Sequence, residues 1–142
     1  KHLLRKILDI SGENVHGVAD LSVRQLMAML SRCDIFLGNN SGPLHLSAAL
    51  GLPTVSLLGP TVVPLWLPWG KGHIVLRKKD LSTSGRGVLA NDRSCLERIT
   101  VDEVLKAVKV QTKRIQRGRQ SGDPGPAQPL DTAIQDPAPM AR

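Results

Sequence analysis

The chain has 142 residues and a formal net charge of +7, and this length is enough for one domain with a hydrophobic core. No apolar run approaches the roughly 20 residues of a membrane-spanning helix, and two cysteines are too few for a disulfide framework, so a cytoplasmic setting is expected. With no tyrosine and a single phenylalanine, the chain lacks aromatic platforms for base stacking, and no nucleic-acid partner is expected.

The first predicted elements are two helices and a short strand. Apolar residues at helical spacing predict an amphipathic helix from His2 to Ile10, and because the chain starts inside it, we interpret the sequence as the later part of a longer protein. A short strand is expected from Val15 to Val18. Ser22 and Gln25 have the spacing of a capping box and predict a second helix from Val23 to about Arg32.

Two short apolar runs follow, Asp34 to Leu37 and Thr54 to Leu58. Their length and their β-branched or aromatic content are typical of buried parallel strands. Cys33 extends the apolar face of the preceding helix and is expected in the core.

The segment between these two strands is predicted to be a helix. Asn40 or Ser41 can cap its start, because short polar side chains accept hydrogen bonds from the first amides of a helix. Pro43 suits the first helical position, and Gly51 can end the helix in a left-handed conformation. The buried face is expected to consist of three residues at helical spacing: Leu46, Ala49 and Leu50.

The start of this helix is the candidate binding site. Free backbone amides there carry a partial positive charge from the helix dipole, so a phosphate is a natural ligand. Gly42 lets the backbone approach a ligand closely, Ser41 adds a hydroxyl group, and His45 adds an imidazole. In an open α/β sheet this loop lies at the carboxyl ends of the strands, where ligands bind. The alternative is an ordinary capped helix without a ligand.

The loop from Gly59 to Gly70 contains three prolines and two tryptophans. It also leaves a strand at its carboxyl end, so it forms either a wall of the same crevice or a packed cover over the core. A strand is predicted from His73 to Arg77 and a loop from Asp80 to Arg93. His73 has no supporting cluster, and no grouping of histidines, cysteines and carboxylates has metal-site spacing, so neither a metal nor a cofactor is expected.

The last predicted element is a helix from Val101 to about Arg117, which Thr100 and Glu103 open with a second capping box. Its buried face is expected to contain Val101, Val104, Leu105, Val108 and Ile115. The predicted domain thus covers residues 1–117. Residues 118–142 are rich in proline, glycine, glutamine and alanine, and we expect a disordered tail because this composition cannot bury enough surface to offset its ordering entropy.

Six basic residues in and just after this helix have no acidic residue between them: Lys106, Lys109, Lys113, Arg114, Arg117 and Arg119. We call them the basic cluster. It is either a solvated helix face or a patch for an anionic lipid surface or an acidic partner.

The alternation of strands and helices predicts an α/β fold with a Rossmann-like, doubly wound parallel sheet. Four stretches, in this order, resemble glycosyltransferase family nine, the ADP-heptose:lipopolysaccharide heptosyltransferases: residues 22–32, 34–51, 59–70 and 94–99. The second stretch carries Asn40-Ser41-Gly42-Pro43-Leu44-His45, which resembles the family's signature.

The resemblance implies the two-domain GT-B fold, of which this chain would be the carboxyl-terminal domain that binds the nucleotide sugar. The implied reaction transfers heptose from ADP-heptose to the lipopolysaccharide inner core with inversion, at the cytoplasmic side of the inner membrane. It also implies donor-binding roles for Asn40, Ser41, Gly42, Leu44 and His45, with amides near Ser41, Gly42 and Leu44 on the diphosphate. The catalytic base and the acceptor domain would lie outside this chain, so no catalytic residue is assigned and the chain alone is expected to be inactive in transfer.

Two departures from the family pattern leave alternatives open. Asn40 stands where the family often has aspartate, and Val62-Val63 stands where it often has Asp-Pro. The first alternative is another nucleotide-sugar enzyme of the same fold with a different donor. The second is a non-catalytic binding module that docks through its basic last helix on a membrane or an acidic partner.

Overall fold

The computed structural model describes residues 2–59, 66–78 and 94–121. The described elements are α1 (His2–Ile10), α2 (Val23–Leu30), β1 (Phe36–Asn39), α3 (Gly42–Ala49), β2 (Thr54–Leu58), β3 (Ile74–Arg77), α5 (Ser94–Glu97) and α6 (Val101–Ser121). The strands form one parallel sheet in the order β1-β2-β3. The predicted α/β fold with a parallel sheet is therefore confirmed.

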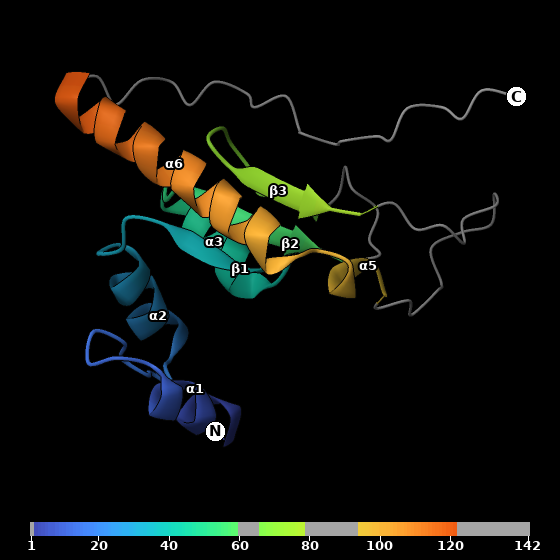
Figure 1. The fold of residues 1–142 in the computed structure, drawn as a ribbon. Helices are drawn as coiled ribbons and strands as arrows, with labels where there is room; N and C mark the ends of the chain where they lie inside the picture. Colours follow the sequence, from blue (N-terminus) through green and yellow to red (C-terminus); the bar gives the residue numbers. More distant parts are fainter. Residues whose placement is uncertain (1, 60–65, 79–93, 122–142) are drawn as a thin grey trace, which may run out of the picture.

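Helices cover the sheet in two layers. α3 contacts β1 and β2, whereas α6 contacts β2 and β3. Figure 1 shows α6 in front of the sheet and α3 behind it, with α1 and α2 beyond β1. The central strand β2 is consequently the most buried, as four of its five residues are inaccessible to solvent.

The described core is small and centres on β2 and α3. Its buried apolar residues are Leu30, Leu44, Ala48, Leu52, Val55, Leu58, Cys95 and Ala107. They come from both helical layers and from the middle of the sheet, as expected when a parallel sheet is covered on both faces.

A partly buried polar network closes the amino-terminal edge of the sheet. The Nδ1 atom of His73 lies 3.0 Å from the hydroxyl oxygen of Thr54, and its Nε2 atom lies 3.2 Å from the carbonyl oxygen of Trp69. Because a carbonyl only accepts, Nε2 donates to it; in the neutral imidazole, Nδ1 then accepts from the Thr54 hydroxyl. The side-chain amide of Gln111 on α6 donates to the carbonyl of Gly72. These bonds attach the end of the segment 66–73 to β2 and α6.

Burial lowers the pKa of His73, and the hydrogen bond to the carbonyl of Trp69 opposes this shift. The neutral form matches the hydrogen bonds that the imidazole makes. The sequence gives no sign of a cluster around this histidine, because its partners Thr54 and Trp69 are apparent only once β2 and the segment 66–73 are folded together.

Both predicted capping boxes are confirmed. The Ser22 hydroxyl accepts from the Gln25 amide, and the Gln25 side chain accepts from the Ser22 amide at 2.9 Å. Thr100 and Glu103 repeat the arrangement, with 2.8 Å from the Thr100 amide to Oε2 of Glu103. These contacts join residues three positions apart, so sequence spacing alone specified them.

Some boundaries near the amino terminus differ from the predictions. Residues 15–18 form no strand, because they pair with none of the described strands β1, β2 and β3. Gly17 lies instead against α1, where an ideal Cβ would come within 2.6 Å of Cδ1 of Leu8. β1 begins at Phe36 and extends to Asn39, two residues later than predicted. α2 ends at Leu30, so Cys33 lies beyond the helix and is exposed instead of in the core.

The predicted buried face of α3 is wrong. The helix buries Leu44, Ser47 and Ala48, while Ala49 and Leu50 are exposed. Periodicity favoured the opposite side because Ser47 counts as polar. In the structure its hydroxyl donates to the Pro43 carbonyl at 2.8 Å, which satisfies the group and allows its burial.

α6 is longer and rotated relative to the prediction. It extends to Ser121 and so includes the first four residues of the expected tail. The rest of that tail, residues 122–142, lies outside the described residues, and so does the predicted loop from Asp80 to Arg93. Val101 and Leu105, predicted to be buried, are 74% and 49% exposed. Ala107 and Gln111 take the buried positions. The Gln111 side-chain amide donates to the Gly72 carbonyl, whereas its Oε1 atom has no partner among the described residues.

Candidate functional site

The predicted site lies where β1 ends and α3 begins, at the carboxyl-terminal edge of the sheet. The Asn40 amide donates to the Leu57 carbonyl at 3.2 Å, which holds the turn against β2. Ser41 is the N-cap residue in an extended conformation. Its hydroxyl does not cap the helix as expected, however, since it donates to the Asn39 carbonyl at 3.2 Å.

The end of α3 agrees with the prediction. Gly51 has φ of +73°, a left-handed conformation that glycine adopts without strain. Pro43 lies in the first turn, one position later than expected, where its missing amide is still without consequence because no intrahelical acceptor is available there.

Two backbone amides at the start of α3 are available to a ligand. The Leu44 amide is already used, because it donates to the Ser41 carbonyl at 3.0 Å, and the His45 amide approaches the same carbonyl at 3.5 Å. The amides of Ser41 and Gly42 precede this first turn, and no hydrogen bond from either is found within residues 2–59, 66–78 and 94–121. They are the donors that a helix start offers to an anion.

Gly42 leaves open space at this point. A Cβ atom built on Gly42 would meet no protein atom within 4 Å, and the residue is not in a left-handed conformation. Neither packing nor backbone strain therefore requires glycine here. A ligand close to the backbone would require it.

Two side-chain atoms near this turn are buried without a partner. Oδ1 of Asn40 and Nε2 of His45 make no hydrogen bond to the described part of the chain. An unpaired buried polar group costs about 1–3 kcal/mol, so such groups mark positions where a ligand or ordered water completes the site. Four of the predicted site residues, Asn40, Ser41, Gly42 and His45, are thus brought together on one turn with unused hydrogen-bonding capacity.

A tryptophan from the segment after β2 contacts this turn. The ring centroids of Trp66 and His45 are 6.4 Å apart, with planes inclined by 51°. From the sequence, the loop from Gly59 to Gly70 is either a wall of the crevice or a packed cover over the core. The position of Trp66 beside His45 supports the first interpretation, although residues 60–65 of this loop lie outside the described ranges.

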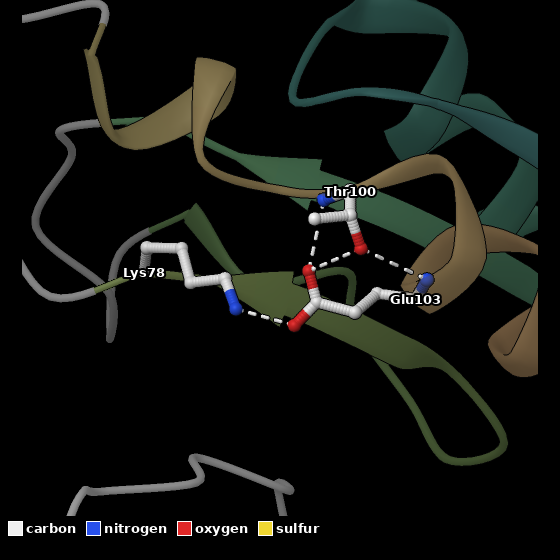
Figure 2. A network of polar contacts seen from close by, with 3 residues as sticks. All are labelled: Lys78, Thr100 and Glu103. Carbon is white, nitrogen blue, oxygen red and sulfur yellow. Dashed lines mark hydrogen bonds and ion pairs between the residues drawn. The ribbon is translucent and has the colours of Figure 1, made fainter.

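A lysine that follows β3 at the same edge of the sheet is engaged elsewhere. Lys78 forms an ion pair with Glu103 in the first turn of α6, and Glu103 also accepts from the amide and hydroxyl of Thr100 (Figure 2). The hydrogen bond from Lys78 is the main cause that lowers the pKa of Glu103 to about 2. This ammonium group therefore joins β3 to α6 and is not directed to the turn at Ser41.

In the described part of the chain, no three His, Cys, Asp or Glu side chains lie close enough together to hold a metal ion. None of the helices in the described ranges is both long enough and apolar enough to cross a bilayer.

In the comparison with known proteins, the chain matches the sequence model of one family. Residues 4–87 match the sequence model described as "Glycosyltransferase family 9 (heptosyltransferase)". The chain is similar to lipooligosaccharide heptosyltransferase 2 of Campylobacter jejuni serotype O:2, with 36% identity over 61 residues, 43% of this chain and 19% of that protein. It is also similar to lipopolysaccharide heptosyltransferase 1 of Campylobacter coli, with 27% identity over 105 residues, 70% of this chain and 29% of that protein.

A third relative is lipopolysaccharide heptosyltransferase 3 of Escherichia coli, with 36% identity over 50 residues, 35% of this chain and 15% of that protein. The matched region is thus 15–29% of the length of these three relatives. No solved structure is significantly similar to the chain.

Proposed function

This chain belongs to glycosyltransferase family 9, the heptosyltransferases, and on that premise we propose that it is the donor-binding half of an enzyme that transfers heptose from ADP-heptose to the lipopolysaccharide inner core. The observation that carries the proposal is the turn from Asn40 to His45. It combines two unused amides at a helix start with two buried, unpartnered side-chain atoms. The relatives named above are all heptosyltransferases that act on lipooligosaccharide or lipopolysaccharide.

In this proposal the diphosphate of the donor binds at the start of α3. The amides of Ser41 and Gly42 donate to phosphate oxygens, and the dipole of α3 favours the negative charge. Ser41 adds its hydroxyl by exchanging its bond to the Asn39 carbonyl for one to a phosphate oxygen. His45 donates from Nε2, which removes one buried unpaired atom.

The same contacts would assist the reaction. As an acceptor hydroxyl attacks the anomeric carbon, the bond to the diphosphate breaks and negative charge grows on the departing ADP. Fixed donors aimed at the oxygens that gain charge stabilise such a transition state more than the ground state. The attack on the face opposite ADP would invert the anomeric centre. The base that activates the hydroxyl would lie outside these residues, so we expect the chain alone to bind the donor and not to transfer sugar.

Asn40 would contact the sugar part of the donor. Its unpartnered Oδ1 can accept a hydrogen bond from a sugar hydroxyl. An asparagine brings no negative charge, and the contact is correspondingly weaker than one to a carboxylate. This feature bears on which sugar is transferred, and it is the reason to test more than one donor.

Calorimetric titration of the 142-residue chain with ADP, UDP and GDP tests the proposal. We expect ADP to bind, and His45→Ala and Ser41→Ala each to weaken binding by about 1.5–3 kcal/mol, the cost of losing a hydrogen bond to a charged group. Wild-type affinity in both variants would remove these residues from the site. Preference for UDP, or turnover of a UDP-sugar by a protein that includes the missing half, would favour an enzyme of the same fold with a different donor.

A second candidate function is docking on an anionic membrane surface, as for a protein peripheral to the cytoplasmic face of the inner membrane. All six residues of the basic cluster are exposed. Lys106, Lys109, Lys113 and Arg117 recur at helical spacing on the side of α6 away from the buried Ala107. Arg119 differs from these four, because it pairs with Asp34.

Vesicle binding tests the membrane contact. Deleting α6 would remove the buried Gln111 and disrupt the fold, so the better variant replaces Lys106, Lys109, Lys113 and Arg117 with glutamine. The matched control replaces four exposed basic residues near the amino terminus, Arg5, Lys6, Arg24 and Arg32. Each basic residue near an anionic surface contributes about 1 kcal/mol. Equal binding of both variants to phosphatidylglycerol vesicles would reject the cluster as a membrane contact.

A further inference from the structure

Trp66 and His45 come from different elements and meet beside the candidate site. His45 belongs to the first turns of α3, whereas Trp66 lies after β2 in the segment that leads to β3. Their ring separation of 6.4 Å and tilt of 51° fall in the range of tilted aromatic pairs. The indole is 49% exposed, so it is neither a core residue nor free in solvent.

No hydrogen bond within the described residues holds Nε2 of His45. Its Nε2 atom is buried and has no partner in the described residues, so no hydrogen bond at that atom fixes the orientation of the ring. A histidine at the start of a helix otherwise has several side-chain rotamers available. Contact with the indole of Trp66 on one side restricts the imidazole without using its nitrogen atoms.

We propose that Trp66 is a positioning residue: it holds the imidazole of His45 so that Nε2 is directed toward the diphosphate of the donor. The inference rests on the proposed function and adds to it a residue outside the signature turn. Trp66 then contributes to affinity by reducing the side-chain entropy that His45 loses when the donor binds.

The segment that carries Trp66 is well attached. Pro68 is buried, and the carbonyls of Trp69 and Gly72 accept hydrogen bonds from His73 and Gln111. A restrained segment can position a side chain, whereas a loose one cannot. This segment therefore limits the movement of Trp66 relative to β2 and α6.

The same segment offers a matched control. Trp69 is 87% exposed and contributes its carbonyl, not its indole, to the hydrogen bond with His73. Trp66→Ala and Trp69→Ala remove the same side chain three residues apart. Only the first is expected to change ADP binding.

The test is a double-mutant cycle on the 142-residue chain, with ADP affinity measured by calorimetry. Trp66→Ala should weaken ADP binding about two- to tenfold, the usual cost of immobilising one side chain. In a chain that already carries His45→Ala, the same change should have no further effect, because Trp66 acts through the imidazole. Trp66→Phe should restore most of the affinity, since a ring remains beside His45.

Several outcomes would overturn the inference. An equal loss from Trp66→Ala with and without His45 would mean that the indole contacts the donor directly. Wild-type affinity in Trp66→Ala, with a clear loss in His45→Ala, would remove Trp66 and leave the proposed donor site intact. If wild-type protein does not bind ADP, the proposed function fails instead. Trp66→Leu, which keeps the site apolar, replaces Trp66→Ala if the latter does not fold.

Discussion

Replacement of Gly42 by alanine should leave stability equal or higher and should lower nucleotide affinity at the same time. The new Cβ would meet no protein atom within 4 Å, and the residue has no left-handed φ that would strain alanine. Alanine is favoured over glycine in a helix by about 0.5–1 kcal/mol, and the first helical position gives at most that gain. The melting temperature of a chain of this size should therefore stay the same or rise by at most roughly 2–4 °C.

The same methyl group would occupy the space where a phosphate oxygen approaches the Gly42 amide. Losing one hydrogen bond to a charged oxygen costs about 1.5–3 kcal/mol, or an affinity that is about 10- to 150-fold lower. Calorimetry with ADP measures this loss, and thermal unfolding measures stability on the same samples.

Gly12→Ala is the matched control, because a Cβ there also meets nothing within 4 Å and that glycine lies outside α3. We expect it to leave ADP affinity unchanged. Undiminished affinity in Gly42→Ala, with stability equal to or above that of the wild type, would refute the assignment of this amide to the phosphate. A large loss of stability would instead contradict the open space beside Gly42.

Three further predictions concern stability. Because burial lowers the pKa of His73, its contribution to stability is present above about pH 6.5 and is lost as the pH falls through the folded pKa. The melting temperature should therefore drop on acidification. His73→Gln should flatten this part of the plot of melting temperature against pH. The pKa of Glu103 is lowered from 4.5 to about 2 by Lys78, so its contribution is lost as the pH falls from 4.5 toward 2, and Glu103→Gln should weaken the pH dependence in that range without altering it near pH 6. Leu44→Ala should cost about 2–5 kcal/mol in urea unfolding and Leu50→Ala less than half as much, since Leu44 is fully buried whereas Leu50 is 37% exposed; equal costs would contradict the observed orientation of α3.

The contrast between α2 and α3 explains which helix properties sequence could predict. The start of α2 depends on Ser22 and Gln25, which bond to each other across three residues, and the end of α3 depends on the backbone freedom of Gly51. The prediction of the buried face of α3 was wrong because both sides of this helix carry apolar side chains. Burial of Ser47 depends on its bond to the Pro43 carbonyl and on the strands that lie over it.

The candidate site likewise has features that the sequence predicted and features that it did not. The turn from Asn40 to His45 was predicted because Ser41, Gly42 and Pro43 have the conformational preferences of a helix start. The sequence did not reveal that the Ser41 hydroxyl bonds backward to Asn39, or that the Leu44 amide is already used by Ser41. Both details depend on the exact backbone path of the turn.

The sequence by itself determined the α/β class, the two capping boxes, the strand β2 and the glycine- and serine-containing start of α3, because each depends on residues within a few positions of one another. Only the tertiary structure decided that Trp66 lies against His45, that His73 joins Thr54 to Trp69, and that α6 buries Gln111 in place of Leu105. Apart from the bond between His73 and Trp69, these direct bonds and ring contacts join residues 19 to 39 positions apart. Local periodicity carries no information about such pairs, because the sheet must form before their side chains can meet.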